Sequence, residues 1–407
     1  MVEHAPLRRF GAGLLLGLMA EQTVLFAVPL MVYQATGSLR YSGLVFALEW
    51  LPALLAYPFA GVLADRVGGR TLLQWANVLR AASLALTVLC CSLAPALTVW
   101  ALAANGVLLS LLMAPVRMAV ERTVPQVAPA ERLAHTQSLV QNMELLAQVL
   151  GPACAAALVL YSGKLALLGL AAAALLLAAL CWHGLPDAHA NSARQPVLGA
   201  LRQGWQLLLG NPPIVSLALL NFSINLAFAC VLSANAFIVS GVFQAADGAF
   251  GLINSAAGAL GLLNFLLVPW LLTRLSIHQL GALGFAVLCG GILAMGLANG
   301  VLAYGASFVL AMAGCTLFNV FNRTQRIKVI PREHLGKVMG PFYLLNLASY
   351  PLGGLLSASI GQRYGIQGLI LALSLLLCVP GALLFHLTTR RLNAALGTEN
   401  PAMEASR

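Results

Sequence analysis

Apolar segments of about 20 or more residues recur along nearly the whole chain. Each is long enough to cross a hydrocarbon core of roughly 30 Å as an α-helix, and the alternating pattern of membrane strands is absent from the sequence. The composition agrees, because 60% of the 407 residues are hydrophobic and only 8% are charged, against roughly a quarter in soluble domains. The sequence therefore predicts an all-α membrane protein that crosses the bilayer many times.

Twelve membrane-spanning helices are expected, in two halves of six. The first half is predicted to span the membrane at residues 10–33, 42–64, 72–93, 97–120, 134–161 and 165–182. The second half is predicted to span it at residues 214–242, 249–272, 280–298, 302–321, 336–360 and 368–387. The expected organisation is therefore an N-terminal six-helix bundle at 1–183, a polar cytoplasmic linker at 184–211, a C-terminal six-helix bundle at 212–390 and a cytoplasmic tail at 391–407.

The distribution of basic residues orients these helices, because cytoplasmic loops retain Lys and Arg. With both termini inside, 17 of the 22 Lys and Arg residues fall on the cytoplasmic side. Only Arg40, Lys164 and Arg363 lie outside, and Arg80 and Arg117 lie within spans. An odd number of helices would remove this bias, so twelve is favoured.

An internal repeat supports the two-half organisation independently of topology. Five residues around the fifth span recur 202 positions later around the eleventh. Pro129, Glu131, Leu133, Ala147 and Gly151 correspond to Pro331, Glu333, Leu335, Ser349 and Gly353. The fifth and eleventh helices are therefore expected to be equivalent, as in a duplicated six-helix unit whose halves face a central path.

The loop after the second span reads G-V-L-A-D-R-V-G-G-R from Gly61 to Arg70. It resembles the signature G-x-L-A-D-R-x-G-x-R of the major facilitator superfamily and lies between spans two and three, where that family carries it. The resemblance implies two pseudo-symmetric bundles and a conformational latch made by Gly61, Asp65, Arg66, Gly69 and Arg70. The glycines allow close helix approach, and Asp65 can pair with a cation or cap a helix in one conformation. The alternative is a plain cytoplasmic turn with solvated charges.

Other stretches resemble one branch of this superfamily, which contains the drug:proton antiporters of the third class and the enterobactin-type siderophore exporters. These are the run from Val28 to Ser38, Leu51 with Pro52, the run from Gly204 to Pro212 and the run from Pro331 to Gly336. In the fifth span, Gly151 and Pro152 are similar to the antiporter motif G-x-x-x-G-P-x-x-G-G. Ala147, Ala155 and Ala156 replace three of its glycines, which weakens the inference of antiport.

Three carboxylates lie well within predicted spans: Glu21, Glu49 and Glu144. Each costs roughly 2.5–3.5 kcal/mol at a helix centre, so each is expected to face a cavity, a partner or a bound proton. Glu21 and Glu144 lead as candidates for proton coupling or substrate contact, because the resemblance implies that helices one and five line the cavity. The alternative is that a Glu only joins two helices. Arg80 is expected to be a counter-charge, whereas Arg117 is expected to reach the cytoplasmic headgroups or to act as a second counter-charge.

The second half has amides in place of deep carboxylates. They are Asn221, Asn225, Asn235, Asn254, Asn264, Asn319, Asn322 and Asn346. Asn221, Asn225, Asn319 and Asn346 are the predicted substrate-cavity residues, and the first two share one helical face. The alternative is that these amides join helices, at about 0.6 kcal/mol per contact.

These features together predict a secondary transporter that exports a small organic molecule by proton antiport with alternating access. A siderophore is the preferred cargo because amides and a few charges suit a polar chelator; macrolide or multidrug efflux is the alternative, and an uptake symporter is third. The expected partners are the substrate, protons and the lipid bilayer of a bacterial inner membrane, with a monomeric chain, no nucleic acid, no metal and no cofactor beyond the proton gradient.

Competing classes lack support in the sequence. The net charge of +10 comes from residues scattered over short loops, which topology explains better than nucleic-acid binding. The eight cysteines have no metal-ligand spacing. The spans contain no arrangement typical of a catalytic site, and no G-x-x-x-x-G-K-[ST] loop for ATP occurs. An enzyme or an ATP-driven pump is therefore not expected, and a channel would not need the duplicated halves.

Overall fold

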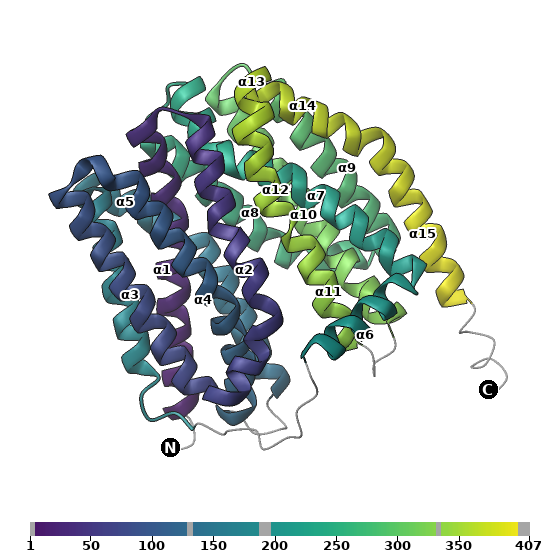
Figure 1. Cartoon of the computed structure of the whole chain (residues 1–407). Coiled ribbons are helices and arrows are strands. Elements are labelled where there is room, and N and C mark those ends of the chain that lie inside the picture. The colour runs from purple at the N-terminus through teal and green to yellow at the C-terminus, as the bar shows by residue number, and fades with distance from the viewer. Residues whose placement is uncertain (1–4, 128–132, 187–196, 331–334, 398–407) are drawn as a thin grey trace. The chain divides into compact units, whose positions relative to one another are not determined.

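The computed structural model describes residues 5–127, 133–186, 197–330 and 335–397. Every regular element within these ranges is helical (Figure 1). In the same ranges nine helices are long and apolar enough to cross a membrane. The three other predicted spans, the fifth, eighth and eleventh, are also helical. The prediction of an all-α membrane fold with twelve spans is confirmed.

The first half of the chain folds into five helices and a short 3₁₀ turn. They are α1 (Ala5–Thr36), α2 (Leu39–Val67), α3 (Gly69–Leu93), η1 (Pro95–Leu97), α4 (Thr98–Val127) and α5 (Leu133–Cys181). The long helix α5 contains two of the predicted spans, with a break at Gly163, where φ is 75° and ψ is 169°. This left-handed backbone favours glycine, and it lies between the predicted ends at 161 and 165. The fifth and sixth spans are therefore separate helices.

The second half contains more interruptions. Its elements are α6 (Val197–Leu209), α7 (Pro212–Ala236), η3 (Phe237–Val242), α8 (Asp247–Leu272), α9 (Ile277–Gly296), α10 (Val301–Val329), α11 (Leu335–Leu347), α12 (Ser349–Leu356), η5 (Ser357–Gly361), α13 (Gln362–Tyr364), α14 (Ile366–Leu376), η6 (Leu377–Gly381) and α15 (Ala382–Gly397). Spans seven, eleven and twelve each include a π-helical segment. Such segments are single-turn widenings of an α-helix, and they are often found at functional sites.

The chain divides into two compact units. Unit 1 comprises Met1–Arg194 together with Ser233–Ala259, and unit 2 comprises Gln195–Leu232 together with Leu260–Arg407. The division at residues 194 and 195 falls inside the predicted linker. The second division crosses α7 and α8, so the end of α7, the segment η3 and the first half of α8 pack in unit 1.

The ends of α7 and α8 that belong to unit 1 pack through aromatic side chains. Phe250 of α8 contacts Phe26 of α1, with ring centroids 5.3 Å apart. Phe237 of η3 meets the ring of Tyr33 edge-on at 5.6 Å, and a Cβ at Gly241 would collide with the Tyr33 hydroxyl. These contacts explain why the segment clusters with helices of the first half.

Helix α6 lies within the region that the sequence indicates as a linker. Its Leu208 is almost fully buried with Ile214 of α7 and with Val338 and Phe342 of α11, and Trp205 packs against the same cluster. The apolar face of α6 is therefore docked on unit 2, and its first residues directly follow the undescribed part of the linker.

Small residues permit the closest helix approaches inside each unit. In unit 2, a Cβ at Gly284 of α9 would lie 2.9 Å from the carbonyl oxygen of Gly314 of α10. In unit 1, a Cβ at Gly151 of α5 would overlap the side chain of Gln22 of α1. Membrane helices associate through such close backbone contacts, because lipid removes most of the hydrophobic driving force between them.

Candidate functional site

A cavity in unit 1 collects most of the charged residues that the sequence places inside spans. It is lined by Glu21, Val24, Leu25, Glu49, Trp50, Arg80, Gly106, Leu109, Ser110 and Met113. These residues come from α1, α2, α3 and α4. The four lining residues of α4 are Gly106, Leu109, Ser110 and Met113. They lie three, four and seven residues after the first, a spacing that places them on one helical face. The cavity has a volume of about 70 Å³ and is open at one side.

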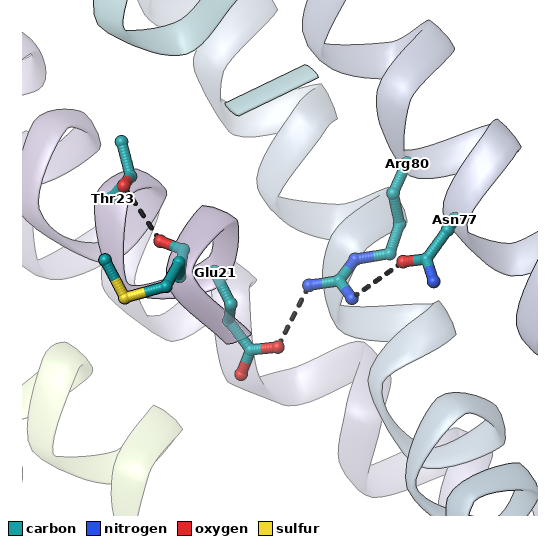
Figure 2. Close-up of polar contacts among 5 residues, drawn as sticks. Glu21, Thr23, Asn77 and Arg80 are labelled. Carbon is teal, nitrogen blue, oxygen red and sulfur yellow. Dashed lines mark hydrogen bonds and ion pairs between the residues drawn. The ribbon is translucent and has the colours of Figure 1, made fainter. Parts of the chain in front are cut away.

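An ion pair between α1 and α3 lies in this cavity (Figure 2). The guanidinium of Arg80 donates from Nη2 to Oε2 of Glu21 at 3.0 Å. Its Nη1 lies 3.5 Å from Oδ1 of Asn77, one turn earlier on α3. The Arg80 side chain is 5% exposed and that of Glu21 is 32% exposed, so the carboxylate is the more accessible member. The structure thus brings Glu21 and Arg80 together.

Glu49 lies on the α2 side of the same cavity. Its side chain passes over Gly106 of α4, since a Cβ at that glycine would lie 2.9 Å from Cγ of Glu49. One turn further along both helices, the backbone N–H of Ala53 donates to Oγ of Ser110 at 2.9 Å. Within the described ranges, Glu49 has no ion-pair partner. Two carboxyl groups and one guanidinium therefore share the cavity.

Glu144 and Arg117 do not line this cavity. Glu144 is half-buried on α5, and Arg117 is exposed on α4. An exposed Arg near the cytoplasmic end of a span can extend its charge toward the headgroups, as the sequence indicated. Of the five predicted charged residues, the cavity thus contains Glu21, Glu49 and Arg80.

Three amides of unit 2 form a buried chain of hydrogen bonds that joins α10, α7 and α11. Asn322 donates from Nδ2 to Oδ1 of Asn221 at 2.6 Å, and Asn221 donates from Nδ2 to Oδ1 of Asn346 at 2.7 Å. Asn346 completes the chain by donating to the backbone carbonyl of Phe342 at 2.7 Å. These Asn side chains are between 2% and 8% exposed. Asn221 and Asn346 are thus engaged in joining helices.

The other amides are distributed differently. Asn225 is half-buried on α7. Asn319 contacts Sγ of Cys315, one turn away on the same helix, at 3.6 Å. Asn235 is buried and Asn254 donates to the carbonyl of Phe250, while the side chain of Asn264 lies outside the described part of the chain. Asn225 and Asn319 remain candidates for cargo contact.

The predicted latch is described in part. Helix α2 runs through Gly61, Asp65 and Arg66, but structural details at these three residues lie outside the described part. Gly69 starts α3 so close to α4 that a Cβ would lie 2.5 Å from Oγ1 of Thr123. The guanidinium of Arg70 donates from Nη1 to the carbonyl oxygen of Leu185 at 3.0 Å.

The start of α3 is therefore tied both to α4 and to the segment after α5. Its Gln74 adds a contact, donating to the carbonyl oxygen of Ala179 at 3.3 Å. Nearby, the indole of Trp182 donates to the carbonyl oxygen of Phe10 at 3.1 Å. This cytoplasmic end of unit 1 is a well-packed block that contains two of the five predicted latch residues.

Sequence reasoning missed polar residues of α3 and α4, one of which contacts Arg80 of the ion pair. Asn77 is fully buried three residues before Arg80, a spacing that places both on one helical face. Ser83 of α3 donates to Oδ1 of Asn105 of α4 at 2.8 Å. A search for polar residues at three- or four-residue spacing from Arg80 would have found Asn77.

The fold and this cavity define a class of protein: a polytopic helical membrane protein with charges held in an internal cavity, as in solute transporters. Residues 10–346 match the sequence profile of the Major Facilitator Superfamily. The chain belongs to this superfamily, and it is a transporter rather than an enzyme.

Solved structures show the same fold at low sequence identity. The nucleoside transporter NupG, in a mutant form, is 13% identical, with a TM-score of 0.77 over 95% of this chain and 99% of that one. A bacterial homologue of the iron transporter ferroportin in an inward-facing state is 16% identical, with a TM-score of 0.71 and coverage of 96% and 98%.

A bacterial homologue of the human lysosomal transporter Spinster, in an inward-facing and unoccupied conformation, is 15% identical. Its TM-score is 0.70, with coverage of 97% of this chain and 98% of that one. Among curated protein sequences, none matches this chain. The likeness to these structures concerns the fold alone.

Proposed function

We propose that this transporter exports a small organic molecule across a bacterial inner membrane by proton antiport, as a monomer that alternates its access. The supporting observation is the cavity of unit 1, where the Glu21–Arg80 ion pair and the carboxyl group of Glu49 lie among apolar side chains. Protons from the gradient are the only co-reactant that this mechanism needs.

The energetics favour a functional reading of this cluster over a purely structural one. A charged residue costs roughly 2.5–3.5 kcal/mol at a helix centre. One ion pair would suffice to join α1 and α3, but the cavity holds a third ionisable group on α2. A carboxyl group in an apolar cavity that opens at one side can take up and release a proton while the helices stay packed.

Two versions of the cargo remain proposals. A siderophore is the first, because amides suit a polar chelator, and the buried chain from Asn322 to Asn346 leaves Asn225 and Asn319 of unit 2 to contact it. Efflux of a macrolide or another amphipathic drug is the second. The apolar lining of the cavity by Trp50 and Leu109 favours it.

Alternating access also needs a device that makes one conformation more stable than the other. We propose that the segment from Gly61 to Arg70 serves as this latch. The bond from Arg70 to Leu185 supports the proposal, because it ties the start of α3 to the beginning of the linker between the halves. Asp65→Asn should therefore slow the transport cycle without changing which solute is chosen.

Purified full-length protein in liposomes with an acidic lumen would test the direction of coupling. An antiporter accumulates solute in the acidic lumen as protons leave, whereas a proton symporter drives solute out of that compartment. The probes are an iron-free chelator that carries a free ammonium group and a radiolabelled macrolide. Accumulation of either that collapses on adding a protonophore supports antiport, and no pH-driven movement of any solute contradicts it.

The matched variant is Glu21→Gln, which keeps the length of the side chain and one acceptor for Arg80 but removes the negative charge. We expect it to abolish accumulation, because Glu49 would then be the only carboxylate among the described lining residues of the cavity and would be neutralised by Arg80. The protein should still fold, as checked by its elution as a single species and an unchanged helical spectrum. Normal accumulation with an unchanged pH dependence would exclude Glu21 from the coupling cluster.

A further inference from the structure

The charges in the cavity of unit 1 do not balance when all three ionisable groups are charged. Glu21 is compensated by Arg80 through the 3.0 Å contact. Glu49 is not compensated by any cation within the described ranges, and no other charged residue lines the cavity. With both carboxyl groups ionised, the cavity therefore holds one uncompensated negative charge.

We propose that Glu49 binds either a proton or the positive charge of the cargo, so that the cargo is a monovalent organic cation with an apolar body. This inference rests on the proposed antiport and deepens it, because it assigns the exchange to one carboxyl group. A proton leaves Oε of Glu49 when an ammonium or similar cation takes its place, and the net charge of the occupied cavity stays the same. The exchange is therefore electroneutral at this group.

The surroundings of Glu49 suit such a ligand. Gly106 has no side chain, so the Glu49 side chain can lie directly against α4 at this position. Trp50 is the next residue and also lines the cavity. An aromatic ring beside a carboxylate favours an organic cation, because the ring face attracts positive charge and its body contacts the apolar substituents.

The remaining lining residues are mostly apolar and fit the body of the ligand. Val24 and Leu25 of α1 and Leu109 and Met113 of α4 contribute hydrocarbon surface. Met side chains adapt to varied shapes. The cavity, about 70 Å³ in volume, suits a small charged head, and an apolar body would extend through its open mouth.

An anionic ligand is disfavoured by the same geometry. Among the described residues, Arg80 is the only cation of the lining, its side chain is 5% exposed, and Glu21 already occupies Nη2. An anion would have to displace Glu21 and would leave two carboxyl groups without a counter-charge. A chelator that carries a free ammonium group fits the cavity, whereas a purely anionic one does not.

The test compares two probes of the same shape and opposite charge, tetraphenylphosphonium and tetraphenylborate. Binding to the purified full-length protein is measured by equilibrium dialysis, and proton release is measured with a pH dye in weakly buffered detergent solution. We expect tetraphenylphosphonium to bind and to release about one proton per bound cation, since one carboxyl group changes partner. We expect tetraphenylborate to bind at least roughly tenfold more weakly.

Glu49→Gln should weaken binding of the cation roughly tenfold or more and remove the proton release, because an amide cannot be ionised. Glu121→Gln is the matched control, since this carboxyl group is exposed near the cytoplasmic end of α4, and both readouts should stay as in the unchanged protein. Proton release that persists in Glu49→Gln, or stronger binding of tetraphenylborate, would overturn the assignment. Either result would leave pH-driven accumulation of a solute, which tests the proposed antiport, unaffected.

Discussion

The chain of amides in unit 2 gives a prediction that separates a structural role from contact with cargo. Asn221 lies at its centre, accepting from Asn322 at 2.6 Å and donating to Asn346 at 2.7 Å. Replacing Asn221 by Ala removes both contacts and leaves a buried donor and a buried acceptor without that partner. If the chain joins helices, the loss is one of stability and not of affinity for the solute.

The size of the effect follows from the two bonds. Hydrogen bonds between membrane helices contribute about 0.6 kcal/mol on average and about 1.7 kcal/mol at most. Asn221→Ala should therefore reduce the free energy of unfolding by about 1.2 kcal/mol, and by no more than about 3.4 kcal/mol. Asn346→Ala should reduce the free energy of unfolding by the equivalent of one or two such bonds. The Asn346 side chain accepts from Asn221 and also donates to the carbonyl of Phe342.

The assay is a double-mutant cycle on the full chain in lipid bicelles, unfolded reversibly with increasing detergent. The two single variants and the double variant should show a coupling energy of about 0.6–1.7 kcal/mol. Asn225→Ala is the matched control on α7, one turn from Asn221, and should not be coupled to Asn346. Changes that add to within about 0.3 kcal/mol would refute the helix-joining role. A raised KM for transport with unchanged stability would assign Asn221 to the cargo.

Two further predictions concern close contacts at glycine. Gly314→Ala on α10 should lower stability by about 1–3 kcal/mol, because its Cβ would collide with the backbone of Leu288 on α9. The control is Gly290→Ala, whose Cβ would meet open space and which should change stability by less than about 0.5 kcal/mol. Equal effects of the two variants would contradict the packing. Gly241→Ala should also be destabilising, and adding Tyr33→Ala should make the pair clearly non-additive in thermal unfolding, since the clash is with that ring.

The membrane fold was predictable because length and composition determine it. A helix needs about 20 apolar residues to cross the bilayer, and a polar or glycine-containing interruption marks its end. The break at Gly163 shows this, since it falls between predicted spans that end at 161 and begin at 165. No tertiary information was needed for that result.

The helix α6 was not expected, because the region around it is polar and contains prolines. Its docking depends on an apolar face that includes Leu208 and fits against α11. A short amphipathic helix in a loop gains its stability from that tertiary contact and not from its own propensity. The same reason explains why the sequence did not predict that residues 233–259 pack in unit 1.

The sequence indicated which residue types form the candidate site, but not which side chains point into the cavity. In a soluble helix, polarity identifies the face that meets the core, but a span surrounded by lipid is apolar on nearly every side. The sequence therefore ranked Glu144 above Glu49, although the structure places Glu49 in the cavity and Glu144 outside its lining. The pairing of Glu21 with Arg80 was easier to expect, because a buried guanidinium needs a counter-charge.

The uncompensated charge on Glu49 also bears on how leak is prevented. Moving the cavity from one side of the membrane to the other takes it through a state closed to water at both ends. With Glu49 ionised and unoccupied, that closure would bury a net charge, at roughly 2.5–3.5 kcal/mol, which reduces the population of the closed state by about two orders of magnitude. A proton or an organic cation on Glu49 removes the penalty equally, whereas the Glu21–Arg80 pair keeps its charges balanced throughout. One carboxyl group can therefore enforce exchange, since the empty ionised cavity is the state that cannot readily close.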